Sequence, residues 1–257
     1  MARIAIGYRN LADTGTMSAS GYAGAMLPTM LQTAHVAERW RTLGTTAWFV
    51  CDLGSLRTVA AVAVMGLNLA ATATFRVRYS TVDSTGAAGD ADDTSTISNG
   101  IDPAYGMAVH LRTAPITCRY VRVDFTDASQ AYIEAGRLAV LETLWQPLTN
   151  FEYGWQWSYE DPSRQSRSWG GQTWVEAQAY YRMAEFTLPN VRHAERTGHV
   201  FPLQRLHGLR HDILVCRDTD TTNLGRDCIW GLMTRLLPLS NPRFNQFSHR
   251  ISVAERL

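Results

Sequence analysis

Short apolar runs separated by polar turns are the feature of this chain that most constrains its fold. The run that begins at Phe75 alternates apolar Phe75, Val77 and Tyr79 with Arg76 and Arg78. Alternation puts one set of side chains on each face of a strand, so we expect a sheet with one solvated side and these arginines in water. Strands of this kind are predicted over residues 59–69, 73–81, 118–126 and 137–145.

A polar stretch, residues 83–100, follows the second of these runs. It is rich in Gly, Ser, Thr and Asp and has almost no apolar content, which predicts a long surface loop. Asp90, Asp92 and Asp93 raise the alternative of a calcium site. Their spacing differs from that of an EF-hand loop, so the pattern favours a solvated loop.

The pattern changes near residue 147, where a proline ends the strand pattern and aromatic residues become frequent. Gly170 and Gly171 predict a hairpin turn, and residues 191–209 are the only candidate helix or irregular crossover. Further strands are predicted over 211–219, 227–237 and 247–257. The prediction is an all-β protein with two tandem β-sandwich domains, residues 1–146 and 147–257, the second being a β-sandwich or a split barrel.

Composition narrows the classes of partner. A formal net charge of +1 with 18% charged residues gives no general attraction to nucleic acid or anionic lipid, which need a clustered basic face. No apolar run reaches the roughly 18 residues of a membrane span, and the N-terminal sequence lacks the apolar region and cleavage site of a signal peptide. We expect no nucleic-acid partner, no membrane insertion and synthesis in the cytoplasm without export.

Cysteine and histidine spacing gives little support for a metal site. The four cysteines contain no C-x-x-C pair, so buried free thiols are expected. His207 and His211 are the only histidines with ligand-like spacing, and Gly208 weakens the helix that would present them. We therefore predict neither metal nor cofactor. The thiols are Cys51, Cys118, Cys216 and Cys228.

The motifs of the first half occur in a familiar order. They are "ERWRT" (38–42), "WFVCDLG" (48–54), "VAAVAVMG" (59–66), "CRYVRVDFTD" (118–127) and "IEAGRLAVLE" (133–142). This order resembles the discoidin-like family of galactose-binding jelly rolls, also called coagulation factor C-type domains, over roughly residues 1–145. The polar loop at 83–100 departs from the family, which often has a hairpin there. The residues that form the calcium site of the family cannot be identified in this sequence.

The resemblance implies that ligands meet the loops at one end of the sandwich. Trp40 has three interpretations: a core residue that closes the end of the sandwich, a ring that stacks on a sugar, or a subunit contact. The candidates for glycan or partner contact are Trp40, Tyr22, His35, Arg39, Arg41 and Tyr132.

The second half is similar to β-sandwich or split-barrel proteins of the tail tips of long-tailed bacteriophages, such as distal and minor tail proteins. The similarity lies in an "SWGGQ" turn (168–172), an "RMAEFTL" strand (182–188) and a final "HRISVAERL" strand (249–257). Aromatic residues between 155 and 174 are interleaved with arginines, a mixture enriched at protein interfaces. We expect about half of these rings in the core and the others in a patch that a ring of subunits buries. The predicted interface residues are Trp155, Trp157, Tyr159, Trp169 and Trp174.

No catalytic motif accompanies these patterns. Carboxylates are numerous enough to propose a glycan-hydrolysing pair, but there is no nucleophile elbow, zincin motif or P-loop. We expect a non-enzymatic structural protein of the virion, in a phage tail tip or baseplate. It would form a trimeric or hexameric ring with itself, contact other tail proteins, and display its first domain toward host-surface glycan. The alternatives are a monomeric non-catalytic carbohydrate-binding protein and, ranked last, a glycan-active enzyme.

Overall fold

The computed structural model describes residues 3–98 and 100–257 and divides the chain into two compact units. The first unit comprises residues 1–146 with 213–228, and the second comprises residues 147–212 with 229–257. Residues 213–228, which the sequence analysis placed in the second domain, thus group with the first unit. The described strand pairs are antiparallel, and the all-β class is confirmed. None of the described helices is long and apolar enough to cross a membrane.

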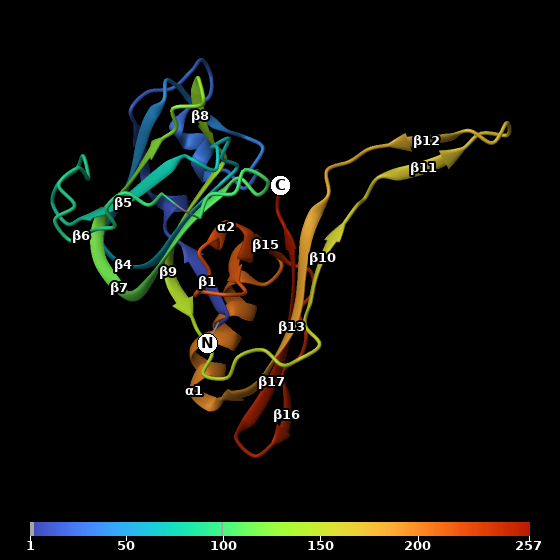
Figure 1. The fold of residues 1–257 in the computed structure, drawn as a ribbon. Helices are drawn as coiled ribbons and strands as arrows, with labels where there is room; N and C mark the ends of the chain where they lie inside the picture. Colours follow the sequence, from blue (N-terminus) through green and yellow to red (C-terminus); the bar gives the residue numbers. More distant parts are fainter. Residues whose placement is uncertain (1–2, 99) are drawn as a thin grey trace. The chain divides into compact units, whose positions relative to one another are not determined.

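The first unit is a β-sandwich with short 3-10 turns and one short helix (Figure 1). Its elements are β1 (Ala5–Asn10), η1 (Ala12–Thr14), β2 (Thr16–Ala19), η2 (Pro28–Gln32), β3 (Trp40–Leu43), β4 (Thr46–Met65), β5 (Thr74–Ser80), β6 (Asp92–Asp93), β7 (Met107–Thr126), β8 (Tyr132–Ala135), β9 (Arg137–Trp145), β14 (Ile213–Cys216) and α2 (Leu224–Asp227).

Two long strands, β4 and β7, belong to both layers of this sandwich. Residues 46–52 of β4 pair with residues 120–126 of β7, and this layer has the order β2-β4-β7-β5-β6. Residues 61–65 of β4 pair with residues 107–111 of β7, and this layer has the order β7-β4-β9-β1-β14. The inward side chains of both layers form one hydrophobic core, in which the Phe49 ring lies 5.8 Å from that of Phe125. The strands predicted over 73–81 and 137–145 are confirmed as β5 and β9, the second with the same bounds. The strands predicted over 59–69 and 118–126 are parts of the longer β4 and β7, and the first of them ends at Met65.

A bulge lets β4 pass from one layer to the other. The pairing of β4 with β7 shifts between Asp52 and Arg57. Gly54 has φ +76°, a conformation that costs a non-glycine residue energy, and its N–H donates to Asp52 Oδ1 at 2.8 Å. The Arg119 guanidinium holds the same carboxylate with two hydrogen bonds and lowers the pKa of Asp52. The Asp-Leu-Gly motif is therefore the bend of the strand.

The polar stretch 83–100 is a surface loop interrupted by the short strand β6; Asn99 lies outside the described residues. Its acidic side chains have protein partners. Asp93 pairs with Arg76, Asp92 pairs with Arg112, and Asp90 accepts from the Thr81 backbone N–H at 2.9 Å. Arg76 and Arg78 of β5, expected in water, are thus held in ion pairs, Arg76 with Asp93 and Arg78 with Asp124.

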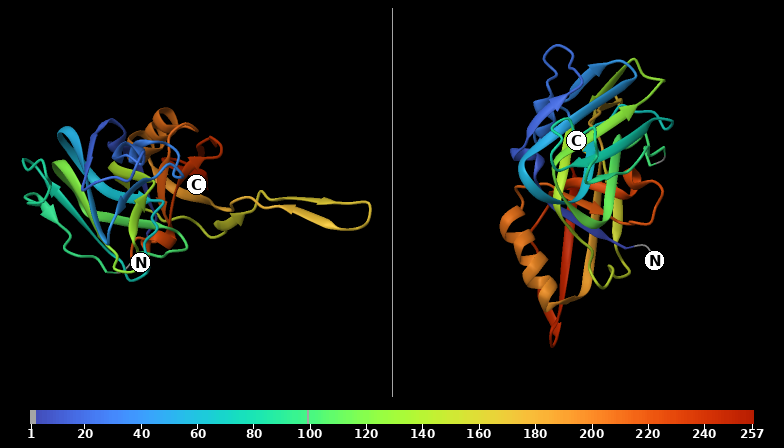
Figure 2. Two further views of the ribbon diagram at one scale, coloured as in Figure 1. Left: turned by 90° about the horizontal axis from the view of Figure 1, so that it is seen from above. Right: turned by 90° about the vertical axis from the view of Figure 1, so that its left-hand side faces the viewer.

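The second unit contains an open antiparallel sheet, a helical segment and a separate hairpin (Figures 1 and 2). Its elements are β10 (Gln156–Glu160), β11 (Arg164–Arg167), β12 (Thr173–Glu176), β13 (Tyr181–Arg192), α1 (His193–Glu195), the π-helical turns η3 (Arg196–Val200) and η4 (Leu203–His207), β15 (Cys228–Met233), β16 (Ser240–Arg243) and β17 (Gln246–Glu255).

The sheet of the second unit has the order β10-β13-β17-β15, with β16 on β17. Alternate residues of β13 are buried, and Phe186 lies opposite Ile251 of β17. The Arg196 guanidinium lies 4.4 Å from the centre of the Phe247 ring, which joins the helical segment to β17. The helix predicted within 191–209 and the strands predicted after it are confirmed.

Candidate functional site

A hairpin formed by β11 and β12 is exposed at every strand residue. Its four pairs run from Arg164 with Glu176 to Arg167 with Thr173. The turn is closed by the Gly171 N–H, which donates to Ser168 O at 2.9 Å, and Gly171 has φ +82°. The predicted Gly-Gly turn is therefore confirmed. A residue with a side chain would be strained at this positive φ, which explains why glycine occupies the position.

This hairpin and the strand ends that lead into it form a segment that we call the hairpin arm, residues 158–180. Every residue of the arm is exposed except Ser163, which is half-buried. Figures 1 and 2 show it as a two-stranded ribbon that continues from β10 and β13 without a further layer on either face. A lone two-stranded hairpin is marginally stable in water, so the arm is a segment that would gain stability from a partner.

The aromatic residues predicted at an interface are concentrated on and near this arm. Trp169, at the tip, is 109% exposed, and Trp174 on β12 is 65% exposed. Tyr159 is exposed and packs on Tyr180, with ring centres 5.9 Å apart. The expectation that about half of the rings are core is wrong, because none of the five predicted residues is buried.

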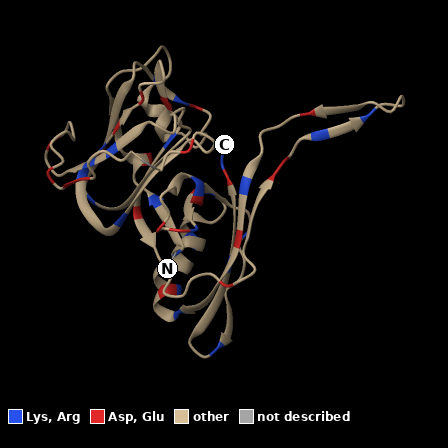
Figure 3. Cartoon of the chain, in the orientation of Figure 1, with Lys and Arg blue, Asp and Glu red and all other residues tan. Residues whose placement is uncertain are grey.

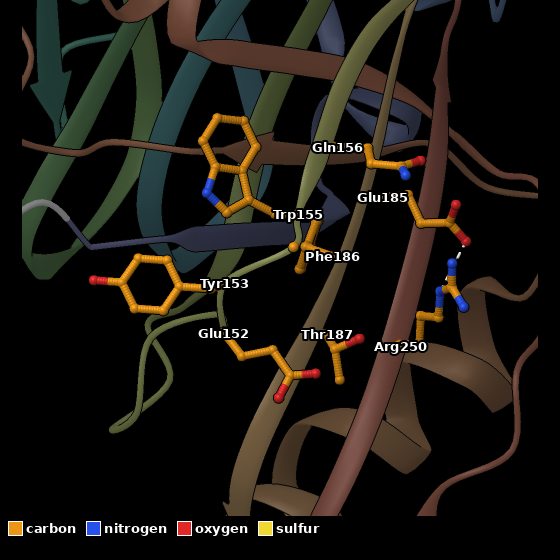
Figure 4. A pocket seen from close by; sticks show the side chains of 9 residues that line it. Glu152, Tyr153, Trp155, Gln156, Glu185, Phe186, Thr187 and Arg250 are labelled. Carbon is orange, nitrogen blue, oxygen red and sulfur yellow. Dashed lines mark ion pairs between the residues drawn. The ribbon is translucent and has the colours of Figure 1, made fainter.

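A pocket of about 190 Å³ lies at the foot of the arm (Figure 4). We call it the foot pocket; residues 152–156, residues 185–187 and Arg250 line it. The Phe151 ring packs on Trp155 at 5.8 Å and on Phe186 at 6.2 Å, and the Glu152 N–H donates to Thr187 O at 3.1 Å. These contacts hold the loop before β10 against β13.

Two carboxylates line the foot pocket, and they differ in their ion pairs. Glu185 contacts both Arg235, at 2.8 Å, and Arg250, at 2.9 Å. Glu152 has no ion pair within residues 3–98 and 100–257. Figure 3 shows both acidic and basic positions in each unit.

A second polar cluster lies on the β3–β8 pair of the first unit. Arg41 and Arg39 both pair with Glu134, which is 6% exposed, and the Arg41 guanidinium lies 4.4 Å from the centre of the Tyr132 ring. Three of the residues predicted to contact glycan or partner, Arg39, Arg41 and Tyr132, are thus brought together by a buried carboxylate that sequence reasoning did not link to them.

The other two loop candidates are exposed. The loop that carries Tyr22 runs beside β3, since the Ala23 N–H donates to Arg41 O at 2.8 Å. Tyr22 itself is 60% exposed. His35 is exposed and its carbonyl accepts from the Glu38 N–H at 3.1 Å, which places it in a separate turn.

Trp40 is a core residue, which corrects its assignment as a glycan contact. Its side chain is 0% exposed, its indole N–H donates to Gly21 O at 2.8 Å, and its ring packs edge-on against Phe49 at 5.6 Å. A ring without exposed area cannot stack on a sugar. Of its three interpretations, the structure selects the core residue.

The candidate metal ligands of the sequence are the histidines and cysteines. Within residues 3–98 and 100–257 no group of three His, Cys, Asp or Glu could hold a metal ion. The His207 and His211 rings contact each other at 5.7 Å without a third ligand. The cysteines are confirmed as buried free thiols.

Two features of the second unit were missed by sequence reasoning. The foot pocket joins residues far apart in the chain, so no local pattern marks it. Phe244 is 98% exposed in the β16–β17 turn. It lies within the polar sequence "NPRFNQ", and an apolar residue in such a turn could have indicated an exposed ring. Gln246 pairs with Arg192, so this turn lies at the end of β13 away from the arm.

No protein-family model and no curated protein sequence matches the chain. It is similar in structure to chitosan-binding module 1 from a chitosanase/glucanase of Paenibacillus sp. IK-5, with a TM-score of 0.39 and 22% identity over 51% of this chain and 98% of the module. The lectin domain of lectinolysin complexed with Lewis B antigen has a TM-score of 0.39 and 19% identity, over 52% of this chain and 97% of that domain. A GH29 fucosidase of Ruminococcus gnavus in complex with fucose has a TM-score of 0.44 and 16% identity, over 52% of this chain and 27% of the fucosidase.

Proposed function

We propose that the protein is a non-catalytic structural subunit that assembles with copies of itself through the hairpin arm. The observation that carries the proposal is that the arm, residues 158–180, has no buried residue yet carries Trp169 and Trp174. Exposed aromatic area of this kind marks an interaction surface, and Trp and Arg are the residues that most often dominate binding energy. A neighbouring subunit on the arm accounts for both features.

The contact is expected to be heterologous, with the arm of one copy on a different surface of the next. Such contacts close into a ring when the rotation between copies closes. We propose a trimeric or hexameric ring in the tail tip or baseplate of a phage or related particle, located in the virion and in contact with other tail proteins. The resemblance of residues 147–257 to distal and minor tail proteins supports this choice of particle.

Solution mass tests the proposal. Light scattering over a concentration series, with negative-stain images of the same fractions, should show a closed trimer or hexamer. The double variant Trp169→Ala/Trp174→Ala should shift the mass toward monomer. Its melting temperature should equal that of the wild-type protein when both are compared at a monomeric dilution, because both rings are exposed on the subunit. Tyr22→Ala, which removes an exposed ring from the first unit, is the matched control. A monomeric wild-type protein at every concentration would contradict self-assembly.

Carbohydrate binding by the first unit is a second candidate function, favoured by the cluster on β3 and β8. Tyr132 offers an aromatic surface, while Arg39, Arg41 and Glu134 supply charged donors and acceptors beside it. Polar groups that fix orientation next to an aromatic ring are typical of ligand sites. We propose host-surface glycan as the ligand, met by this cluster and by Tyr22.

A glycan array followed by titration calorimetry tests this second function. Tyr132→Ala should abolish binding of any glycan that the wild-type protein retains, while Leu43→Ala, an exposed residue on the same pair of strands, should leave binding unchanged. Equal loss in both variants would exclude the cluster as the binding site. Absence of binding to every glycan by the wild-type protein would remove the function itself.

A further inference from the structure

Residues 192–211, the end of β13 and the helical segment after it, carry exposed charge of one sign. The only carboxylate among them is that of Glu195, which is 9% exposed and accepts from the Leu148 N–H at 2.9 Å and the Arg192 N–H at 3.0 Å. Three of the four arginines are exposed and have no ion pair in the part of the chain that the structure describes. These three are Arg192, Arg205 and Arg210.

Apolar side chains are exposed among these arginines. Thr197, Phe201 and Arg205 are exposed at every fourth position of the helical segment, so they share one side of it. Phe201 is 45% exposed, Leu206 39% and Leu209 47%. We call this basic and apolar surface the helical face. It comprises Arg192, Phe201, Arg205, Leu206, Leu209 and Arg210.

The base of the arm has the opposite charge. We call residues 158–163 together with 176–181 the arm base; it contains three exposed carboxylates and no basic residue. None of the three carboxylates has an ion pair within residues 3–98 and 100–257. The rings of Tyr159 and Tyr180, 54% and 62% exposed, pack together in the same segment. The carboxylates are those of Glu160, Asp161 and Glu176.

Within one copy these two surfaces do not neutralise each other. The arm base ends at Tyr181, where β13 begins, and Arg192 is the last residue of that strand. At about 3.3 Å per residue, an extended strand of this length puts roughly 36 Å between the arm base and Arg192. Arg205 and Arg210 have no ion pair with the arm base either. Each copy thus displays an acidic aromatic surface and a basic apolar surface, each with three unpaired charges.

We propose that the arm base of one copy docks on the helical face of a second copy. The three carboxylates then lie opposite the three arginines, and the tyrosine pair covers the apolar residues between them. The inference rests on the proposed self-assembly and names the surface that receives the arm. Because the same chain carries the matching charges and the matching apolar area, a second copy fits the helical face better than nucleic acid or anionic lipid does. The contact is heterologous, since it joins different surfaces of one chain.

Charge reversal tests the contact. The helix variant, Arg205→Glu/Arg210→Glu, and the arm variant, Glu160→Arg/Glu176→Arg, each place like charges opposite one another. Each should raise the concentration needed for half-assembly by at least about tenfold. The chain that combines both variants has opposite charges again and should assemble within about threefold of the wild-type concentration. Light scattering over a concentration series measures all four proteins.

Two controls separate a lost contact from a general effect of charge or folding. Arg243→Glu makes the same kind of change at an exposed position of β16 without an ion pair among the described residues, and should assemble as the wild-type protein does. Arg205→Gln/Arg210→Gln removes charge without adding repulsion and should lose less assembly than the helix variant. Melting temperatures at a monomeric dilution should be equal in all variants, because the altered side chains are exposed.

The outcomes separate the inference from the function on which it rests. Normal assembly of the helix variant, together with loss of assembly in Trp169→Ala/Trp174→Ala, would overturn the helical face as receiver and leave assembly through the arm standing. A combined variant that stays monomeric, or an equal loss in Arg243→Glu, would also overturn it. So would a helix variant that assembles normally but loses binding to double-stranded DNA or phosphatidylserine vesicles. A monomeric wild-type protein would overturn both the inference and the proposed function.

Discussion

At the scale of single residues, burial decides which aromatic side chains are structural and which are available for binding. Trp40 and Trp169 have the same chemistry, yet one is 0% and the other 109% exposed. Trp40 also gives its indole proton to Gly21 O. The same substitution at the two positions should therefore have opposite consequences for folding and for association.

Trp40→Ala should destabilise the folded chain by about 3–5 kcal/mol, because it leaves a cavity against Phe49 and an unpaired Gly21 carbonyl. Urea unfolding of the variant and the wild-type protein measures this difference. Trp169→Ala, the matched control, should unfold at the wild-type urea concentration when both are compared at a monomeric dilution. A loss below about 1 kcal/mol for Trp40→Ala would contradict its place in the core.

Because His249 is buried, we expect the free energy of unfolding to depend on pH. It is 2% exposed on β17, its Nδ1 has no hydrogen-bond partner among the described residues, and burial lowers its pKa to about 4. The unfolded chain, with a pKa near 6.5, therefore binds the proton first. Stability should fall as the pH drops from about 6.5 toward about 4, by up to about 3 kcal/mol from this group.

His249→Leu should flatten the free energy of unfolding between pH 6.5 and pH 4, as measured by urea titrations at each pH. His110, whose pKa burial also lowers to about 4, stays in both proteins, so the difference between them isolates His249. Identical pH profiles would show that His249 is not buried in its neutral form.

At the scale of elements, short motifs explain where strands bend and turn. The Asp-Leu-Gly sequence bends β4 because Asp52 receives both the Gly54 N–H and the Arg119 guanidinium. The Gly-Gly turn closes the arm through Gly171 and Ser168. Both turns were predictable from sequence because their hydrogen bonds join residues only a few positions apart.

Asp52→Ala should lower the free energy of unfolding by about 1–2 kcal/mol, because it removes the turn bond and the arginine pair together. Arg119→Ala, which removes the pair and keeps the turn bond, should cost less. Thermal and urea unfolding of the two variants give the comparison. An equal cost would mean that the turn bond contributes nothing to the bend.

At the scale of the whole molecule, the exposed arm predicts a protein whose mass depends on salt. Arginine pairs at a partly exposed contact weaken as the Debye length falls from about 10 Å at 0.1 M salt to about 3 Å at 1 M, whereas burial of a tryptophan does not. Assembly should shift toward smaller species between these salt concentrations, as measured by light scattering. Arg205→Gln/Arg210→Gln should show little of this salt response, and an equal response would assign it to other charges.

The sequence by itself determined the strand pattern, the class of fold, the buried thiols and the exposed hairpin turn. Each depends on local alternation, on cysteines that are scattered along the chain, or on residues that favour a turn. Tertiary structure decided which tryptophan is core, that Glu134 joins Arg39, Arg41 and Tyr132, and that residues 152–156 and 185–187 form a pocket. These depend on which strands become neighbours, and pairing between distant segments is not encoded in any local pattern.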